Sequence, residues 1–541
     1  MLAGTPVILL KEGAERAEGA DARERIIKAA SALAESVRST LGPRGRDKML
    51  VDSLGDVVIT NDGVTILQKM EVDHPAARML VEVAKAQDQE CGDGTKTSVI
   101  LTGELLHRAQ ALIEQKIHPT VIVQGFQIAS GKALERLAAI ARPVGPADSA
   151  ILEGIAMTSM ISKGVGGFRS GLARLAVRAV TEVVDTVDGR VRFDRKNIQI
   201  VKRPGGEVQD SELIDGHIVE QSAVHPDCPK RVGPARIALV EGAFEFRKTE
   251  YTAEIRISEA SQIEAFRAEE ERSVQTMVDA VVRSGANAVF CEKGIDDVAA
   301  EHLARAHILA VRRAKRSDLE LLARATGGRL VARPADITPA DLGTAAWVEE
   351  RKIGDDRLTV VLGSPHAKAV TLLVRGGTEH VVDEVERSLT DAVMTVGIAL
   401  EDGRIVTGAG AAAMELSRSL HDFAPSLGGR AQMAVDAFAT ALEIVPSTLA
   451  ENAGMDTIDA LIEMRRRHKA GAIHAGIDVL GGRVADMETV AVEPMRVDRQ
   501  IILGATEAST MLLRIDDIIA SKRSASGAPP GGHPPVGEFG A

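Results

Sequence analysis

One glycine-rich segment has the residue types that a phosphate-binding loop needs. It reads Gly92-Asp93-Gly94-Thr95-Lys96-Thr97-Ser98 and stands just before an apolar run with helical spacing. Glycines let the backbone bend sharply, and free N–H groups at a helix start attract phosphate. Asp93 could hold a Mg²⁺ ion that bridges phosphate oxygens. A capped helix after a glycine turn explains the same residues, and the Walker A pattern fails because no Gly-Lys-Thr/Ser follows at its spacing.

Two further glycine turns could contribute to the same site. Thr407-Gly408-Ala409-Gly410 precedes a helical run over 411–420, and Leu41-Gly42-Pro43 ends the first helical pattern. Proline disfavours helical geometry in the residue before it, so the helix stops there. Each turn alone is weak, but three turns within one folded unit could converge on a nucleotide.

Two carboxylates are candidates for acid–base chemistry. Asp62 follows a strand-like segment in Thr60-Asn61-Asp62-Gly63, and Asp391 lies in a helical pattern. A carboxylate near the terminal phosphate of a magnesium-bound triphosphate could orient or deprotonate an attacking water. The alternatives are an Asx-turn for Asp62 and an ordinary exposed acid for Asp391. Spacing along the sequence does not decide between these interpretations.

Other chemistries lack their signatures. No histidine has zinc-site spacing, no GxSxG elbow occurs, and the three cysteines form no CxxC pair, which favours reduced thiols in a cytoplasm. The formal net charge of -12 and an aromatic content of 2% argue against nucleic-acid binding. The longest uncharged stretch, 117–131, is shorter than the about 20 residues that span a bilayer, so no membrane segment is expected.

The chain has 541 residues, a length that favours three or four domains of about 150 residues. Along it, mainly helical segments alternate with segments that mix helices and strands. Apolar periodicity predicts helices over 21–41, 75–90, 95–115 and 119–140, with a strand pair at 48–52 and 56–60. Asp21 and Glu24 resemble a capping box. From Ile405 onward the pattern is helical again. The first and last segments therefore predict a single helical unit.

The middle of the chain has a different rhythm. Short apolar runs at 237–240, 288–291, 308–311 and 329–331 alternate with helices at 296–305 and 317–326. This alternation is typical of a parallel sheet. Further strands are expected at 197–202, 357–362 and 370–374, and a helix from 376 toward 400. A long charged helix, 261–284, is inserted before the sheet and should project from it, and the Pro/Gly-rich tail from 524 should be disordered.

Several long motifs in one register resemble the group II chaperonins, meaning the archaeal thermosome and the eukaryotic cytosolic ring chaperonin. The resemblance covers residues from about 5 to 522. The segments that carry it are TLGPRGRDKMLVDSLGDVVITNDGVTIL (40–67), GDGTKTSVILTGELL (92–106), DSELIDGHIVEQSAVHPDCPKRV (210–232), DLGTAAWVEERKIGDD (341–356), VTLLVRGGTEHVVDEVERSL (370–389), LAENAGMDTIDALIEM (449–464) and ATEASTMLLRIDDII (505–519).

The resemblance implies a multidomain α and α/β fold. A mostly helical equatorial ATPase domain would come from both chain ends, 1–145 and 404–522. An α+β intermediate hinge domain would comprise 146–214 and 369–403. An α/β apical client-binding domain would span 215–368, with a helical lid protrusion near 244–284 that makes a separate co-chaperonin unnecessary. Residues 523–541 would form the disordered tail.

The resemblance also implies roles for individual residues. Asp62 and Asp391 match the acidic pair that positions the hydrolytic water, and Asp93 matches the magnesium ligand. Lys163 matches a lysine that senses the terminal phosphate, and Glu493 matches a carboxylate near the ribose. The remaining nucleotide-binding matches are Gly42, Pro43, Gly92, Gly94, Thr95, Lys96, Thr97, Ser98, Gly408 and Gly410.

The family likeness implies an ATP- and Mg²⁺-dependent chaperone subunit that hydrolyses ATP and folds non-native proteins. The subunits, identical or paralogous, would assemble into two stacked rings in the cytoplasm, with no nucleic-acid or membrane partner. Two residues depart from the family: Lys96 replaces a threonine, and Ala409 replaces a glycine, which risks a clash if position 409 needs a positive φ. The alternative function is therefore a ring-forming holdase or scaffold with weak or absent hydrolysis.

Overall fold

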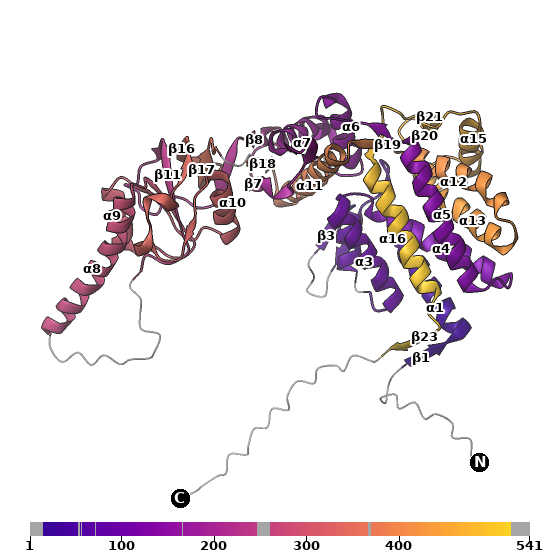
Figure 1. The fold of residues 1–541 in the computed structure, drawn as a ribbon, viewed down its shortest axis with the longest axis horizontal. Helices are drawn as coiled ribbons and strands as arrows, with labels where there is room; N and C mark the ends of the chain where they lie inside the picture. Colours follow the sequence, from indigo (N-terminus) through magenta and orange to yellow (C-terminus); the bar gives the residue numbers. More distant parts are fainter. Residues whose placement is uncertain are drawn as a thin grey trace, which may run out of the picture.

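The structure is a computed structural model that describes residues 15–51, 55, 57–70, 72–164, 166–245, 260–365 and 369–520. The molecule is elongated, with a helical bundle at one end, a middle layer containing α6, α7 and α11, and an α/β unit at the other end (Figure 1). Residues 246–259 of the expected lid segment and the expected disordered tail lie outside the described residues.

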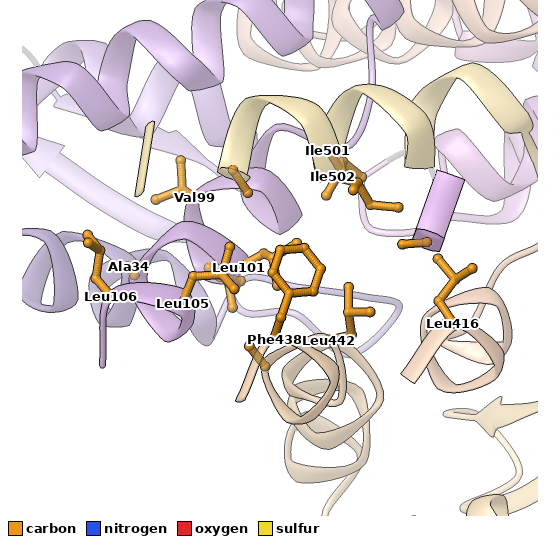
Figure 2. Packing of buried hydrophobic residues seen from close by; sticks show 14 of the residues in the cluster. Ala34, Val99, Leu101, Leu105, Leu106, Leu416, Phe438, Leu442, Ile501 and Ile502 are labelled. Atoms are coloured by element: carbon orange, nitrogen blue, oxygen red, sulfur yellow. The ribbon is translucent and has the colours of Figure 1, made fainter. Parts of the chain in front are cut away.

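Helices from both ends of the chain share one hydrophobic core, which contains residues from Ile26 to Leu137 and from Ile398 to Leu513. Aromatic side chains are few, so Ala, Val, Ile and Leu fill most of it (Figure 2). Small residues let the helices approach closely: a Cβ on Gly125 would lie 2.3 Å from the Ala434 Cβ. The helices of this bundle are α1 (Gly19–Arg38), α2 (Gly63–Lys69), α3 (Pro75–Cys91), α4 (Thr95–Glu114), α5 (Pro119–Ile140), α12 (Ala411–Phe423), α13 (Gly429–Leu442), α14 (Ile444–Ala453), α15 (Thr457–Lys469) and α16 (Met495–Leu513).

The helical bundle also contains short antiparallel strand pairs. They are β1 (Glu15–Glu18) with β23 (Asp517–Ala520), β2 (Lys48–Val51) with β3 (Val57–Thr60), and β20 (Ala475–Asp478) with β21 (Arg483–Asp486). The strand pair predicted from sequence is thus confirmed. The predicted capping box is wrong, because α1 begins at Gly19 and Asp21 lies in its first turn, where it pairs with Arg25 at 3.0 Å.

One helical stretch of the described residues, 429–453, is long and apolar enough to cross a membrane by length and composition alone. Of its most apolar window, 61% is buried inside the protein. This burial is what the core of a helical bundle requires of its apolar helices.

A second core joins the bundle to the rest of the molecule. Helix α11 (Glu379–Asp402) packs there against α6 (Ser149–Ser159) and α7 (Arg169–Val183). The adjacent sheet has the order β7-β18-β8, with β7 (Ile198–Pro204) parallel and β8 (Glu212–Ile214) antiparallel to β18 (Val370–Gly376). Other strands nearby are β4 (Arg142–Pro143), β19 (Arg404–Thr407), β22 (Val492–Pro494), β5 (Asp185–Val187) and β6 (Arg190–Arg192).

The far unit contains the predicted parallel sheet, which is confirmed. Its order is β13 (Leu309–Val311), β12 (Ala288–Cys291), β11 (Ala235–Val240) and β14 (Leu330–Val331), with β15 (Gly343–Ala345) antiparallel to β11. Apolar clusters cover both faces, as expected for a parallel sheet. The helices are α8 (Ala260–Ser284), α9 (Asp297–Arg305) and α10 (Arg316–Thr326), and α8 extends away from the sheet (Figure 1).

A second, antiparallel sheet completes the far unit. Its order is β10 (Arg231–Val232), β16 (Trp347–Ile353), β17 (Asp356–Leu362) and β9 (Gly216–Val219).

Candidate active site

Residues from both ends of the chain line a single cleft beside the helical core. The cleft contains about 1350 Å³ of unfilled space, its open mouth included. The lining includes these residues proposed from sequence: Gly42, Pro43, Asp93, Gly94, Lys96, Thr97, Gly408, Gly410 and Glu493.

The start of α4 supplies free backbone donors to this cleft. Gly94 is the N-cap with φ 82°, and its own N–H donates to Asp93 Oδ1 at 2.7 Å. The Ser98 N–H donates to the Gly94 carbonyl at 3.0 Å, so the three preceding N–H groups have no partner within the helix. Such a helix start attracts an anion.

Two other glycines allow close approaches that a side chain would prevent. Gly42 has φ 81°, and a Cβ there would lie 2.4 Å from Leu449 Cδ2. A Cβ on Gly408 would lie 2.0 Å from Glu493 Oε1. A side chain at either position would displace the Leu449 or Glu493 side chain, and at Gly42 the positive φ would add backbone strain.

Ala409 does adopt the left-handed conformation that its position demands, with φ 55°. Its carbonyl accepts a hydrogen bond from the Ile477 N–H at 3.0 Å, which ties the turn to β20. A non-glycine residue in this region costs about 1–2 kcal/mol. The turn therefore forms with alanine, at some cost in stability.

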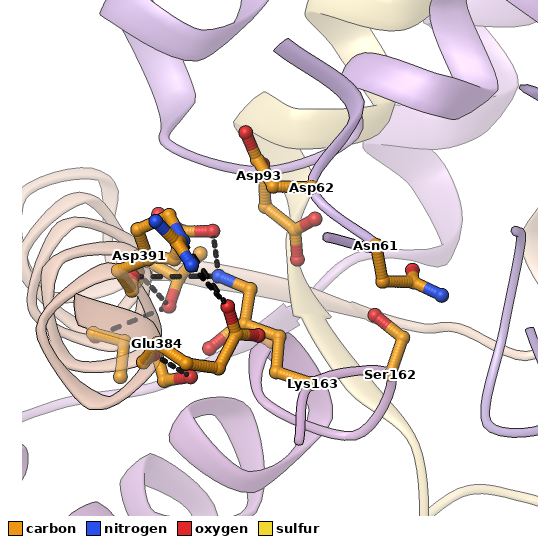
Figure 3. A network of polar contacts seen from close by, with 12 residues as sticks. Asn61, Asp62, Asp93, Ser162, Lys163, Glu384 and Asp391 are labelled. Atoms are coloured by element: carbon orange, nitrogen blue, oxygen red, sulfur yellow. Dashed lines mark hydrogen bonds and ion pairs between the residues drawn. The ribbon is translucent and has the colours of Figure 1, made fainter. Parts of the chain in front are cut away.

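An ion pair between Lys163 and Asp391 stands next to the cleft (Figure 3). Lys163 lies in the loop after α6, Asp391 lies on α11, and their side chains are only 6% and 18% exposed. Asp62 approaches from the bundle side as the N-cap of α2, where its carboxylate accepts the Thr65 N–H at 2.8 Å. Asp93 lies in the same group of charges (Figure 3).

The carboxylates of this group differ in their proton affinities. Burial alone would raise the pKa of Asp62, but the Lys163 ammonium and the Thr65 N–H outweigh it and hold that pKa below its usual value. Burial raises the pKa of Asp391 to about 7, although Lys163 opposes the rise. Burial likewise raises the pKa of Asp93. Separated pKa values in one site are typical of an acid–base pair.

Lys96 extends its side chain away from the helix start into a cluster of oxygens. Its Nζ donates to Asn61 Oδ1 at 2.7 Å, to the Thr40 carbonyl at 3.1 Å and to the Asn61 carbonyl at 3.2 Å. Ser162 Oγ lies 3.5 Å away. Lys96 therefore binds the three segments around it.

Besides Asp62, Lys163 and Asp391, which lie next to the cleft, three residues proposed from sequence do not line it. Gly92 ends α3 with φ 68°, and a Cβ there would lie 2.6 Å from Met394 Cβ, so it brings α11 close. Thr95 and Ser98 are buried, and Ser98 Oγ donates to the Thr95 carbonyl at 2.8 Å. Gly92, Thr95 and Ser98 therefore stabilise the 92–98 segment without facing the cleft.

Sequence reasoning missed Asn61, Ser162 and Asp498. Among the described residues, Asn61 Nδ2 and Asp498 Oδ2 are buried atoms without a hydrogen-bond partner, and Asp498 lines the cleft. Asp498 lies in the first turn of α16, five residues after Glu493, and that spacing was the available signal. An unpaired buried polar atom is costly, so a polar ligand or a water in the cleft would pair with Asp498 Oδ2.

The donor set fits Mg²⁺ shared with a phosphate rather than an all-protein site. No group of three His, Cys, Asp or Glu in the described part of the chain is arranged to hold a metal alone. Mg²⁺ in phosphate sites typically takes one or two carboxylates and completes its shell with water and phosphate oxygens. The Asp93 carboxylate at the mouth of the α4 helix start matches that requirement.

The model of the TCP-1/cpn60 chaperonin family matches residues 33–523 of the chain. The chain belongs to this family. It is 52% identical to the thermosome subunit beta of Archaeoglobus fulgidus over 99% of both chains. It is also 52% identical to a thermosome subunit of Methanopyrus kandleri, over 96% of this chain and 95% of that one.

A solved structure of a group II chaperonin matches this chain. An open-state monomer of a group II chaperonin from Methanococcoides burtonii matches with a TM-score of 0.63 and 41% identity, over 78% of this chain and 100% of that one. The resemblance stated from sequence and the multidomain α and α/β fold class are confirmed. The protein is a group II chaperonin subunit, and its function is that of a molecular chaperone.

Proposed function

We propose that this chaperonin subunit binds Mg²⁺ and ATP in the cleft and hydrolyses ATP to drive protein folding. The observation that carries the proposal is that the α4 helix start, with Asp93 and Lys96, lines the cleft, while Asp62 and the Lys163–Asp391 ion pair lie beside it. No such cluster is needed for packing, because buried charges destabilise a fold unless they are paired.

The phosphates would lie along the glycine turns. The N–H groups at the start of α4 face the position of the phosphates, and the turn at Gly42 and Pro43 closes the other side. Asp93 would hold Mg²⁺, which neutralises charge on the phosphate oxygens. Gly408, Gly410 and Glu493 would hold the nucleoside end, where Ile477 of β20 and the following Val479 and Leu480 also line the cleft.

The acidic pair would act on the attacking water. Asp62 is ionised at neutral pH and is fixed by its cap to Thr65, so it can orient a water by accepting a hydrogen bond. Asp391, with a pKa of about 7, can take the proton that the water releases. Lys163 holds the Asp391 carboxylate in place and adds a positive charge beside it.

Hydrolysis at this position can move one part of the subunit against another. Asp62 and Asp93 belong to elements of the helical bundle, whereas Lys163 and Asp391 belong to elements of the second core. A terminal phosphate between them would favour the arrangement that brings both parts together. We propose that 1–145 with 404–522 form the ATPase domain, that 146–214 with 369–403 form the hinge, and that 215–368 form the client-binding domain.

The assembly follows from the same proposal. Subunits, identical or paralogous, would form two stacked rings in the cytoplasm and enclose unfolded or partly folded clients, so that aggregation is prevented. The projecting helix α8 and the segment near 244–284 would close the chamber, without a separate lid protein. Neither nucleic acid nor a membrane is a proposed partner.

Phosphate release by purified rings tests the proposal. Wild type should hydrolyse ATP in the presence of Mg²⁺, and the double variant Asp62→Asn, Asp391→Asn should lose at least about 100-fold in rate. Asn keeps the helix cap at position 62. Ring assembly of the double variant is checked first, because Asp391→Asn leaves Lys163 without its buried partner. The exposed Asp73→Asn is the matched control. Wild-type turnover no higher than that of the double variant would instead favour a holdase or scaffold, to which Lys96 and Ala409 point.

A further inference from the structure

The Lys96 side chain ends in a cluster of neutral oxygens contributed by three separate segments. Two backbone carbonyls, an amide oxygen and a hydroxyl surround its Nζ, at 3.1 Å (Thr40), 3.2 Å and 2.7 Å (both Asn61) and 3.5 Å (Ser162). Thr40 follows α1, Asn61 precedes α2 and Ser162 follows α6. No carboxylate is hydrogen-bonded to this ammonium among the described residues.

Such a set of oxygens suits a monovalent cation. Rings of backbone carbonyls replace the hydration shell of K⁺ in protein sites. A lysine ammonium is a compact point charge with three donors, so it can satisfy the same oxygens from a flexible stem. With no cation present, the oxygens of Thr40, Asn61 and Ser162 would face one another without a positive partner.

The surroundings are built to admit the lysine stem. A Cβ on Gly63 would lie 2.7 Å from Lys96 Cγ, so a side chain at position 63 would block its path. Asp62 and Asp93 both attract the ammonium, whereas the Lys163 ammonium repels it. Burial lowers the pKa of Lys96 to about 8, so most molecules carry the charge at neutral pH.

We propose that the Lys96 ammonium takes the place of a monovalent cation. It holds the segments of Thr40, Asn61 and Ser162 together at the phosphate end of the cleft, so the protein does not need K⁺ there. This inference rests on the proposed function, because it assigns a positioning role within the same nucleotide site. Thr40 precedes the Gly42 turn and Asn61 precedes Asp62, so the ammonium holds the phosphate-side turn and the segment of Asp62 together.

The test replaces the ammonium with a short hydroxyl. In Lys96→Thr the oxygen cluster loses its charge, and external K⁺ can enter. Wild-type affinity for a fluorescent ATP analogue and wild-type turnover should be the same in potassium and in tetramethylammonium salts. In the variant, both should fall at least about tenfold in tetramethylammonium and recover in potassium, as expected for the loss of charge-assisted hydrogen bonds. Lys85→Thr, an ion-paired lysine on the surface of α3, is the control and should respond like wild type.

A nucleotide-free measurement separates this inference from the proposed function. The urea midpoint of unfolding of Lys96→Thr should be higher in potassium than in tetramethylammonium, because a cation that binds only the folded state stabilises it. The wild-type midpoint should not distinguish the two salts. A potassium requirement in wild type, or a variant indifferent to potassium in both measurements, would overturn the role of Lys96. A wild type that binds no ATP in either salt would overturn the nucleotide site, while the unfolding midpoints still decide the cation role.

Discussion

The Lys163 ammonium forms an ion pair with the Asp391 carboxylate, which joins the loop after α6 to the middle of α11. The two residues are 228 positions apart in the chain, and both side chains are mostly buried. Lys163 also donates to the Arg387 carbonyl at 3.4 Å, which adds a second link to the same helix. The pair therefore fixes one side of the acid cluster.

Removing the lysine should impair both folding and turnover. In Lys163→Met the Asp391 carboxylate loses its buried partner, which typically costs about 3–5 kcal/mol, part of it recovered when Asp391 takes a proton. ATP turnover should fall at least about tenfold at neutral pH, and its acid limb should move to higher pH. A pH–rate profile measures both. An unchanged midpoint of the acid limb would show that Lys163 does not control Asp391.

Turnover of wild-type rings should depend on the ionisation of Asp391. Since burial raises its pKa to about 7, the fraction of Asp391 able to accept a proton falls as the pH drops through that value. The rate should therefore decrease toward acid pH with a midpoint near 7, measured as phosphate release under saturating ATP. Asp391→Asn should show a low rate without this midpoint. A wild-type rate that is flat from about pH 5 to about pH 8 would contradict the assignment.

Ala409→Gly should stabilise the protein. Ala409 has φ 55°, and glycine reaches this region without the steric cost of a Cβ. Glycine also increases the conformational entropy of the unfolded chain, which offsets part of this gain. The free energy of unfolding should therefore rise by about 0.5–1 kcal/mol. Urea unfolding measures it. Ala86→Gly, at an exposed position inside α3, should instead lose about 1 kcal/mol, and equal losses in both variants would rule out strain at Ala409.

Asp498 should destabilise the nucleotide-free fold at alkaline pH. Burial, followed by the charge of Asp93, raises the pKa of Asp498 to about 7. Its contribution to stability is therefore fully present below its ordinary pKa and is lost as the pH rises toward 7. Asp498→Asn, which stays neutral, should be more stable than wild type by about 1–2 kcal/mol at about pH 8 and by much less at about pH 5. Urea midpoints at the two pH values measure the difference, and a gain that does not depend on pH would contradict it.

The bundle and the far unit could be predicted well because their signals are local. The apolar stripes of α3, α4 and α5 repeat within each helix, and the strands β11, β12 and β13 are short apolar runs between helices. Helices α6 and α7 were not identified as elements. The family resemblance, rather than periodicity, pointed to Lys163 in the loop that follows α6.

The candidate site was only partly predictable, since its geometry depends on contacts between distant segments. The Gly-Asp-Gly motif predicted a helix start that could accept phosphate, and the structure has that helix start. The direction of the Lys96 side chain depends on the space that Gly63 leaves, and the sequence around Lys96 does not contain that information. The unpartnered oxygen of Asp498 likewise depends on how α16 packs against the cleft.

Asp62 and Asp93 from the helical bundle and Asp391 from α11 are expected to surround one triphosphate. A density map of the assembled protein with Mg²⁺ and a non-hydrolysable ATP analogue tests it most directly. The terminal phosphate should lie between the start of α4 and the Asp62–Asp391 pair, with Mg²⁺ on the Asp93 carboxylate. A nucleotide bound elsewhere, or phosphates distant from these three carboxylates, would contradict the account.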